Sequence, residues 1–125
     1  MPDNRFTIEK QTERGRYVLI DKRPEANAAA DAPGPVEIGE EAYVDVTDDE
    51  GRIERVFYHT GVSKDYAGQG LASTLVRTAV DDAIVDGARI VPVCPYVKSW
   101  LRKHPDYAEH LVEPREDHIR AITSS

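Results

Sequence analysis

Two glycines separated by one residue, Gly68 and Gly70, lie between a segment of strand-forming residues and a segment with helical periodicity. Glycine lets the backbone approach a ligand closely, and the unpaired N–H groups of a first helical turn attract anions. The spacing favours a phosphate-binding loop, although a tight turn without a ligand gives the same pattern. The two common nucleotide motifs do not fit, because the P-loop ends in Gly-Lys-Ser/Thr and the dinucleotide fingerprint needs a third glycine at Ser73.

Outside this loop, His59 and the single cysteine, Cys94, have side chains that can take part in catalysis. A thiolate is a nucleophile, and an imidazole can take a proton from an attacking group. Each also has a structural interpretation, since a cysteine ending a core strand is most often a small buried apolar residue and a strand histidine often fills a core. The other histidines show no spacing typical of a metal site, and we expect none: His104, His110 and His118.

A basic cluster follows the cysteine in this otherwise acidic chain, at Lys98, Arg102 and Lys103. It fits either a solvated helix face or a set of contacts to the phosphates of an anionic ligand. Tyr96 and Tyr107 are most simply explained as core or interface aromatic residues, although each also has a hydroxyl that can donate a proton.

The elements that must position these residues read in the order strand, strand, strand, strand, helix, strand, short helix. Alternation and turn residues predict hairpins over 5–20 and 41–60. Four-residue periodicity predicts a helix over 68–86, and an apolar run predicts a last buried strand over 89–97. A short helical pattern follows within 98–112. The fold class is therefore α+β, with a single mostly antiparallel sheet, a central helix after the glycine loop and a short C-terminal helix.

Three further features refine this arrangement. Pro92 has no N–H, so the last strand must lack a partner on one side there. Residues 23–38 contain three prolines and no sustained period, which indicates a flexible loop insertion, either solvated or functional. The polar segment 114–125 is expected to be a frayed tail.

A length of 125 residues suits one domain, and we treat 1–125 as a single unit. The net charge of −7 is uneven, with 8 basic and 14 acidic residues in 1–57 but 8 and 9 in 58–125. This balance argues against nucleic acid or a membrane as partner and places any anionic ligand on the second half. One cysteine allows no internal disulfide, and no apolar segment opens the sequence, so we expect a cytoplasmic location.

The glycine loop resembles the pyrophosphate-binding motif of the GNAT superfamily of acyl-coenzyme A-dependent N-acetyltransferases, Gln/Arg-x-x-Gly-x-Gly/Ala. Here the motif reads Ala67, Gly68, Gln69, Gly70, Leu71, Ala72, with alanine where arginine or glutamine is usual. His-Thr-x-Val at 59–62, Pro-x-Cys-Pro at 92–95 and His-Pro-x-Tyr at 104–107 accompany it in order. Together the four motifs resemble the short, stand-alone GNAT-like subfamily over about residues 40–112.

The resemblance implies a GNAT-like fold and acetyl-CoA as co-substrate, bound by residues 67–72, by the strand end at Val62 and by Lys98 and Arg102. In the subfamily the histidine and cysteine at these positions are candidate catalytic residues, here His59 and Cys94. The implied reaction is acetyl transfer to an amine of a small molecule or a protein, by direct attack with His59 as base. A covalent route through acylated Cys94 is the second mechanism.

Two other functions remain open at this point. The loss of arginine or glutamine at Ala67 and the lack of an obvious acid fit a coenzyme A-binding or protein-interaction module with little catalysis. A cysteine hydrolase built on Cys94 and His59 is more distant, because the sequence has no cysteine-protease signature. The sequence does not specify an oligomeric state.

Overall fold

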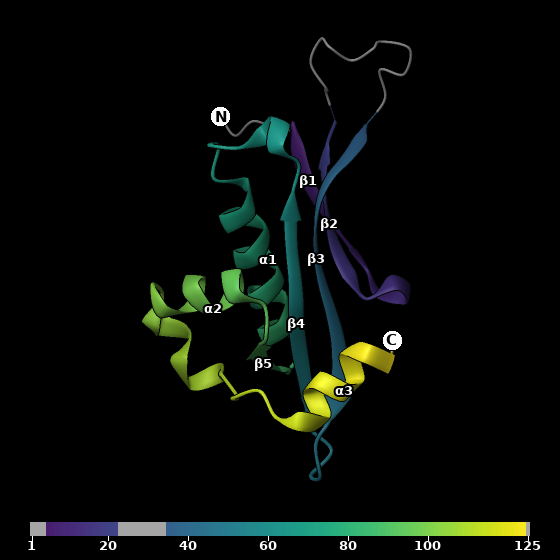
Figure 1. Cartoon of the computed structure of the whole chain (residues 1–125), viewed down its shortest axis with the longest axis vertical. Helices are drawn as coiled ribbons and strands as arrows, with labels where there is room; N and C mark the ends of the chain where they lie inside the picture. Colours follow the sequence, from purple (N-terminus) through teal and green to yellow (C-terminus); the bar gives the residue numbers. More distant parts are fainter. Residues whose placement is uncertain (1–4, 23–34, 125) are drawn as a thin grey trace.

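The sheet consists of five strands in the order β1-β2-β3-β4-β5, as seen in Figure 1. The computed structural model describes residues 5–22 and 35–124. Neighbouring strands are antiparallel except β4 and β5, which are parallel. The strands are β1 Phe6–Gln11, β2 Arg16–Asp21, β3 Val36–Thr47, β4 Ile53–Val62 and β5 Arg89–Pro92. The helices are η1 Thr12–Arg14, η2 Lys64–Tyr66, α1 Leu71–Val85, α2 Pro95–Arg102, η3 Pro105–His110 and α3 Glu116–Ser124.

Both predicted hairpins are present, and local turn chemistry explains them. Gly15 has a φ of 64° after η1, and only glycine adopts this left-handed conformation readily. In the β3–β4 turn the Asp48 carboxylate accepts hydrogen bonds from the N–H groups of Glu50 and Arg52 at 2.8 Å. Such an Asx-type turn fixes the register of the strands that it connects.

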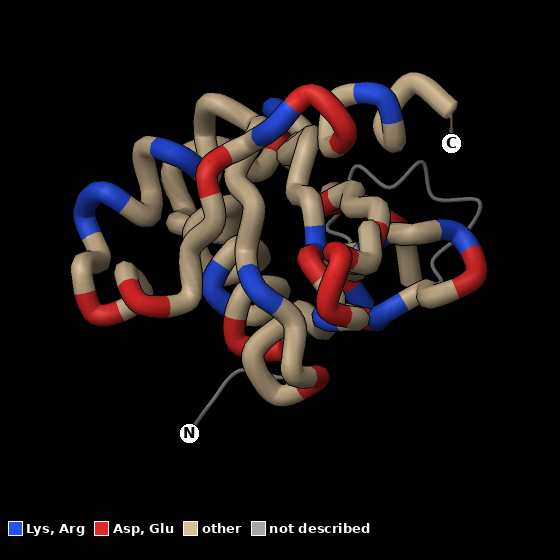
Figure 2. The backbone as a smooth tube through the Cα atoms, turned by 90° about the horizontal axis from the view of Figure 1, so that it is seen from below, with Lys and Arg blue, Asp and Glu red and all other residues tan. Residues whose placement is uncertain are grey.

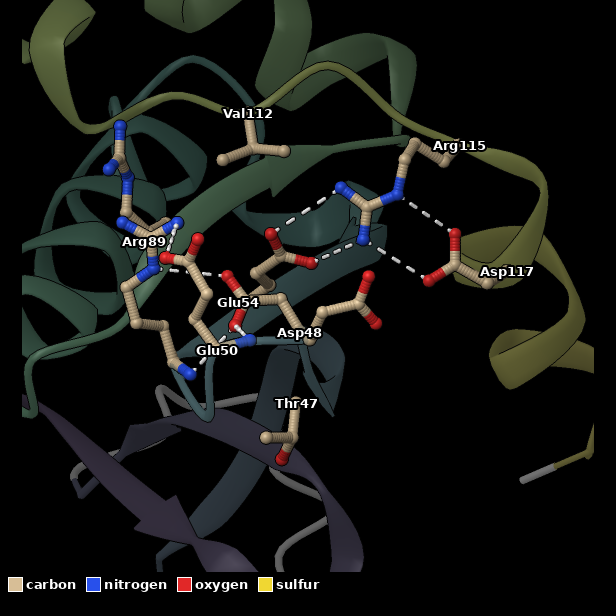
Figure 3. A pocket seen from close by; sticks show the side chains of 10 residues that line it. Thr47, Asp48, Glu50, Glu54, Arg89, Val112, Arg115 and Asp117 are labelled. Carbon is tan, nitrogen blue, oxygen red and sulfur yellow. Dashed lines mark hydrogen bonds and ion pairs between the residues drawn. The ribbon is translucent and has the colours of Figure 1, made fainter.

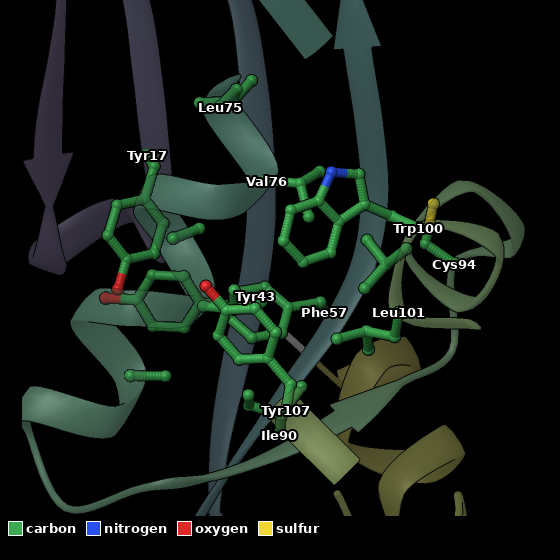
Figure 4. Close-up of a cluster of buried hydrophobic side chains, with 14 of the residues drawn as sticks. Tyr17, Tyr43, Phe57, Leu75, Val76, Ile90, Cys94, Trp100, Leu101 and Tyr107 are labelled. Carbon is green, nitrogen blue, oxygen red and sulfur yellow. The ribbon is translucent and has the colours of Figure 1, made fainter. Parts of the chain in front are cut away.

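Helix α1 packs its predicted apolar face on the sheet. The six buried residues of α1 are Leu71, Leu75, Val76, Ala79, Val80 and Ala83. They meet aromatic side chains of three strands, Tyr17, Tyr43 and Phe57, and Figure 4 shows this cluster together with Trp100 of α2. The prediction for 68–86 is confirmed, with the helix beginning after Gly70.

Strand β5 is shorter than the predicted strand at 89–97. It pairs with β4 only over residues 89–92, after which the N–H groups of Val93 and Cys94 both donate to the Phe57 carbonyl oxygen at 3.0 Å. Pro92 has no N–H to continue the ladder, and Pro95 suits the first position of a helix. The apolar run 93–97 therefore belongs largely to α2, which corrects the sequence-based prediction.

The C-terminal segment is a helix, so the expectation of a frayed tail at 114–125 is wrong for the described residues. His118 of α3 is fully buried, and its Nε2 lies 2.8 Å from Oε1 of Glu54 on β4. Its Nδ1 accepts a hydrogen bond from the Arg115 N–H, which leaves Nε2 as the donor to Glu54. Figure 3 shows Arg115 joining Glu54 and Asp117 at this end of the sheet.

The expected loop at 23–38 falls mainly on residues 23–34, which lie outside the described residues. Its last residues are part of β3, where Val36 is paired with Asp21 and Ile38 is buried. The strand therefore begins before the point that the sequence indicated, because pairing with β2 extends β3 beyond its obvious alternating pattern.

Acidic and basic residues are interspersed over the described elements (Figure 2). The buried Arg55 of β4 illustrates the pattern, since it donates hydrogen bonds to Asp45 at 2.8 Å and to Asp86 at 3.1 Å. These contacts tie the C-terminal end of α1 to the sheet. Among the described residues, no helix combines the length and the apolar character needed to cross a bilayer.

The Glu54 anchor predicts acid-sensitive stability. Burial alone would raise the pKa of Glu54, but hydrogen bonds from Arg115 and His118 outweigh burial and hold the pKa below 4.5, its ordinary value. A lowered folded-state pKa stabilises the fold above the unfolded value, and this contribution is lost as the pH falls through the folded value. Glu54→Gln should lower the free energy of unfolding at neutral pH by about 1–3 kcal/mol, and by less in acid.

Urea denaturation of both proteins, monitored by circular dichroism from neutral pH to below pH 4.5, measures the effect. The control is Glu116→Gln on α3, because the Glu116 side chain is 89% exposed and its substitution should change stability little. Equal losses at all pH values, or equal losses in both variants, would contradict the assigned anchor.

Candidate functional site

Strand β4 continues beyond the end of β5 and leaves one edge of its last residues, 58–62, without a β5 partner. The N–H of Ser63 donates to Ile38 on β3 at 2.8 Å. Backbone groups of successive strand residues point to opposite sides, so the N–H of Val62 faces the side where β5 has departed. In Figure 1 β4 runs past β5 toward η2 and the start of α1. We call this unpaired edge of β4 the gap between β4 and β5, and its end at Val62 lines the same cavity as the glycine loop.

The glycine loop presents its backbone to open space. Gly68 and Gly70 have φ values of 83° and 72°, and a Cβ added at either would meet no atom within 4 Å. Thr74 N–H bonds the Gly70 carbonyl, while no side chain caps α1. The N–H groups of the first helical turn thus lack a capping side chain, which is the arrangement that binds phosphate.

A cavity of about 250 Å³ lies in front of this loop. Its lining residues are Val62, Ser63, Lys64, Tyr66, Ala67, Gly68, Gly70, Leu71, Ala72, Ser73 and Tyr96. Of the residues predicted to bind the cofactor at 62 and 67–72, only Gln69 is outside this lining. Lys64 is the cation that the sequence analysis missed, and its position two residues after the strand end was the available signal.

The loop is fixed to the N-terminal hairpin through η2. The Tyr66 hydroxyl donates to the fully buried carboxylate of Asp21 at 2.5 Å, and Arg5 binds both carboxylate oxygens at 2.9 Å. The hydrogen bond to Asp21 raises the pKa of Tyr66 and keeps the phenol protonated. The rings of Phe6 and Tyr66 also meet edge to face, with 6.1 Å between their centroids. The N-terminal hairpin, which contains none of the four sequence motifs, therefore holds the glycine loop in place.

Lys98 and Arg102 lie on another side of α2. They line a separate hollow of about 480 Å³ together with Pro92 and Glu113. At 100° per residue they point about 200° and 240° around the helix from Tyr96, which faces the loop cavity. The structure therefore does not bring the predicted cationic pair to the glycine loop.

Cys94 lies where the chain leaves β5, at the N-cap position of α2, and is 6% exposed. Its Sγ is 3.3 Å from the hydroxyl oxygen of Thr60, on the part of β4 that borders the gap. Figure 4 shows the thiol beside Trp100 and Leu101. The cysteine is thus a buried group at the wall of the gap between β4 and β5.

Glu41 is a functional candidate that the sequence analysis missed. This β3 residue is fully buried, its Oε1 accepts a hydrogen bond from the Thr60 hydroxyl, and its Oε2 has no hydrogen-bond partner among the described residues. Burial raises its pKa to about 8, against the Thr60 hydrogen bond, and the Glu40 charge adds to the rise. The available signal was alternation, which places Glu41 on the same strand face as the core residue Tyr43.

His59 lies on the opposite face of the sheet. It directly precedes Thr60, and adjacent strand residues project to opposite sides. Its imidazole is 56% exposed, with Nε2 3.8 Å from a Glu40 carboxylate oxygen. The two predicted catalytic residues are therefore not in contact, and His59 and Cys94 flank the sheet from its two faces.

The tyrosine candidates differ in position. Tyr96 lines the loop cavity and is 40% exposed, and burial together with the Glu41 charge raises its pKa. Tyr107 is buried, and its hydroxyl donates to Asp81 on α1 at 2.5 Å, which assigns it to packing. Within residues 5–22 and 35–124, no group of three potential ligands is arranged to hold a metal ion.

The sequence model of GCN5-related N-acetyltransferases matches residues 29–111, two thirds of the chain. The chain belongs to the GCN5-related N-acetyltransferase family. Comparison with curated protein sequences found no significant match.

Solved structures agree with the family in fold. The NMR structure of a GCN5-like protein from Staphylococcus aureus matches with a TM-score of 0.57 and 22% identity, over 93% of this chain and 97% of that chain. The NatC complex bound to Gag peptide and CoA matches with a TM-score of 0.47 and 19% identity, over 60% and 45%. A ribosomal-protein-alanine N-acetyltransferase from Brucella melitensis gives 0.45 and 17%, over 83% and 67%. The match to the Staphylococcus aureus structure confirms the predicted α+β, GNAT-like fold class.

The buried Glu41 predicts a second pH effect, of opposite sign to that of Glu54. Its folded-state pKa of about 8 lies above 4.5, the ordinary pKa of a glutamate, so its contribution to stability is present below pH 4.5 and is lost as the pH rises through 8. Glu41→Gln should therefore gain stability relative to the natural protein between these values, by at most about 1.4 kcal/mol per pH unit.

Chemical denaturation at several pH values tests this expectation. Glu37→Gln on the same strand is the control, because the Glu37 side chain is 47% exposed. If natural and Glu41→Gln proteins respond to pH in parallel, the carboxyl is ionised in the folded protein and the assignment is wrong.

Proposed function

We propose that this member of the GCN5-related family is an N-acetyltransferase that transfers the acetyl group of acetyl-CoA to an amine. The observation that carries the proposal is the continuity between the glycine-loop cavity and the open edge of β4. The pyrophosphate would bind the N–H groups of the loop and first turn of α1, with Lys64 supplying positive charge. The pantetheine arm would then enter the gap between β4 and β5.

In this proposal the thioester would lie in the gap between two chemically different faces of the sheet. The N–H of Val62 points into it and can stabilise the oxyanion that forms when the amine attacks the carbonyl carbon. His59 would take the amine proton, directly or through water, from the exposed face of the sheet. The C–N bond forms, the C–S bond breaks, and coenzyme A leaves on the side of Cys94.

The acceptor would be an amine of a small molecule or a protein. Glu40, beside His59 at 3.8 Å, would favour the approach of a cationic group on that face. The same carboxylate is ion-paired with Arg16 at 3.0 Å, so its attraction is moderated. We infer a weak preference for cationic amines.

A second function, coenzyme A binding with little catalysis, is favoured by one observation. The two residues predicted to be catalytic, His59 and Cys94, do not meet and so do not form one catalytic unit, and the covalent route with His59 as activator lacks the contact that it requires. A module of this kind would bind acetyl-CoA through the same loop but release no coenzyme A thiol in the presence of amines.

Substitution in the loop tests acetyl-CoA binding. Gly70→Ala should weaken the affinity measured by isothermal titration calorimetry at least about tenfold, because the methyl group enters the space that the phosphates need. Gly87→Ala at the end of α1 is a matched control, since Gly87 has a φ of 79° and equally open surroundings but is outside the cavity. Equal affinities in the two variants would contradict phosphate binding at this loop.

Release of the coenzyme A thiol across a panel of amines separates enzyme from module. His59→Gln should reduce turnover about 10²-fold, the lower range for a general base, while His110→Gln on η3 should not. Rapid-quench mass spectrometry should find no acetyl group on Cys94, because direct attack forms no acyl-enzyme. Full turnover in His59→Gln would remove this residue as the base, and acetylated Cys94 would replace direct attack with the covalent route.

A further inference from the structure

The proposed function leaves one buried group without a role, the carboxyl of Glu41. Its exposure is zero, one oxygen is bound by the Thr60 hydroxyl and the other has no hydrogen-bond partner among the described residues. An unpartnered buried polar atom lowers the stability of the fold. Since an apolar residue would avoid this loss, the position invites a functional explanation.

The carboxyl lies at the end of a continuous chain of hydrogen-bonding groups. Glu41 on β3 contacts the hydroxyl of Thr60 on β4, and the same oxygen of Thr60 lies 3.3 Å from Sγ of Cys94. A hydroxyl both donates and accepts. When Glu41 is protonated, the contact between the two oxygens reverses, so that the Glu41 O–H donates to Thr60 and the Thr60 hydroxyl is free to donate to Sγ of Cys94. The chain ends at the wall of the gap in which the thioester sulfur is proposed to lie.

We propose that Glu41 is a positioning residue that supplies, through the Thr60 hydroxyl and the Cys94 thiol, the proton taken up by the coenzyme A sulfur as it leaves. This inference rests on the proposed function. It fills the acid role for which the sequence offered only Tyr96 and Tyr107.

The proton transfers balance without any further reactant. As the thioester C–S bond breaks, its electron pair stays on the coenzyme A sulfur, which takes the proton of the Cys94 thiol. Cys94 takes the hydroxyl proton of Thr60, and Thr60 takes the proton of the Glu41 carboxyl. The net change is a free coenzyme A thiol and a Glu41 carboxylate, which solvent reprotonates before the next turnover.

The surroundings of Glu41 keep its proton in place at neutral pH. The titratable groups next to Glu41 in sequence, register or contact are Tyr17 of β2, Glu40 and Tyr43 of β3, His59 of β4, Cys94 at the N-cap of α2 and Tyr96 of α2. None of the described lysines or arginines forms an ion pair with Glu41, and burial raises its pKa to about 8. A carboxyl that remains protonated at pH 7 can act as an acid, as an ordinary glutamate cannot.

Comparing two acetyl donors tests the role in the leaving step. Glu41→Gln should lower kcat/KM for acetyl-CoA at pH 7 about tenfold or more, but leave the rate with p-nitrophenyl thioacetate unchanged, because an aryl thiolate leaves without a proton. Thr60→Val should behave like Glu41→Gln, whereas Thr60→Ser keeps the hydroxyl and should restore the rate. Glu37→Gln is the control, and thermal unfolding of each variant verifies folding.

The pH profile provides a readout that a purely structural role would not change. The ratio of the natural to the Glu41→Gln rate with acetyl-CoA should fall toward one as the pH rises through about 8, where Glu41 loses its proton. NMR of the protein labelled with ¹³C at glutamate carboxyls should show one carboxyl, absent in Glu41→Gln, that titrates in the same range. A Glu41 carboxyl already ionised at pH 6 would overturn the inference.

The outcomes separate the two proposals. An active natural protein with an equally active Glu41→Gln variant on acetyl-CoA would refute the role of Glu41 and leave the proposed function intact. Equal losses with both donors would show a structural role only and would also refute the inference. A natural protein that transfers acetyl from neither donor would refute the proposed function, and the proton relay with it.

Discussion

The carbonyl oxygen of Phe57 accepts hydrogen bonds from both Val93 and Cys94, and this double acceptance ends the pairing of β4 with β5. Pro92 cannot extend the ladder, and Pro95 begins α2 in a new direction. The last residues of β4 therefore keep a free edge, and the thiol of Cys94 comes to the wall of the gap. Glycine loop, gap and cysteine depend on this one point of divergence.

The second constraint is the placement of a carboxyl in the core beside that gap. Residues that break the local rules of burial without an evident structural gain are expected at functional sites. Glu41 breaks such a rule, because one of its oxygens is buried without a partner. By contrast, the buried carboxylate of Asp21 is satisfied by Arg5 and Tyr66 and supports the loop. The presence or absence of hydrogen-bond partners, more than burial itself, distinguishes the carboxyl that we propose to react from the structural one.

How much of this could be predicted from the sequence depends on how local each signal is. The hairpins and α1 follow from alternation and four-residue periodicity, which are properties of neighbouring residues. The prediction of a frayed C-terminal tail was wrong because α3 is held by the contact of His118 with Glu54, which lies 64 residues away in sequence. The last strand was predicted to be too long because a short apolar run is equally compatible with a strand and with a buried helix.

The candidate site was predicted in part for the same reason. The glycine loop is a local motif, and its cavity includes most of the residues assigned to it. The relation between His59 and Cys94 depends on which face of β4 the chain after β5 approaches, and that is a tertiary property. Thr60, one residue along, is the position that meets the thiol. A one-residue step in a strand changes the face, so family motifs identified the segments but not the pairs.

The acidic character of the chain is compatible with an anionic ligand because several of its carboxylates are ion-paired with arginines. Asp45 and Asp86 engage Arg55, Asp21 engages Arg5, and Glu54 engages Arg115. Acidic residues commonly occupy the first turn of a helix, where they satisfy its positive end. The first turn of α1 has none and has no capping side chain. The positive end of the α1 dipole at the glycine loop is thus not neutralised by a side chain and can attract an anionic ligand. The net charge of the protein alone would predict that such a ligand is repelled.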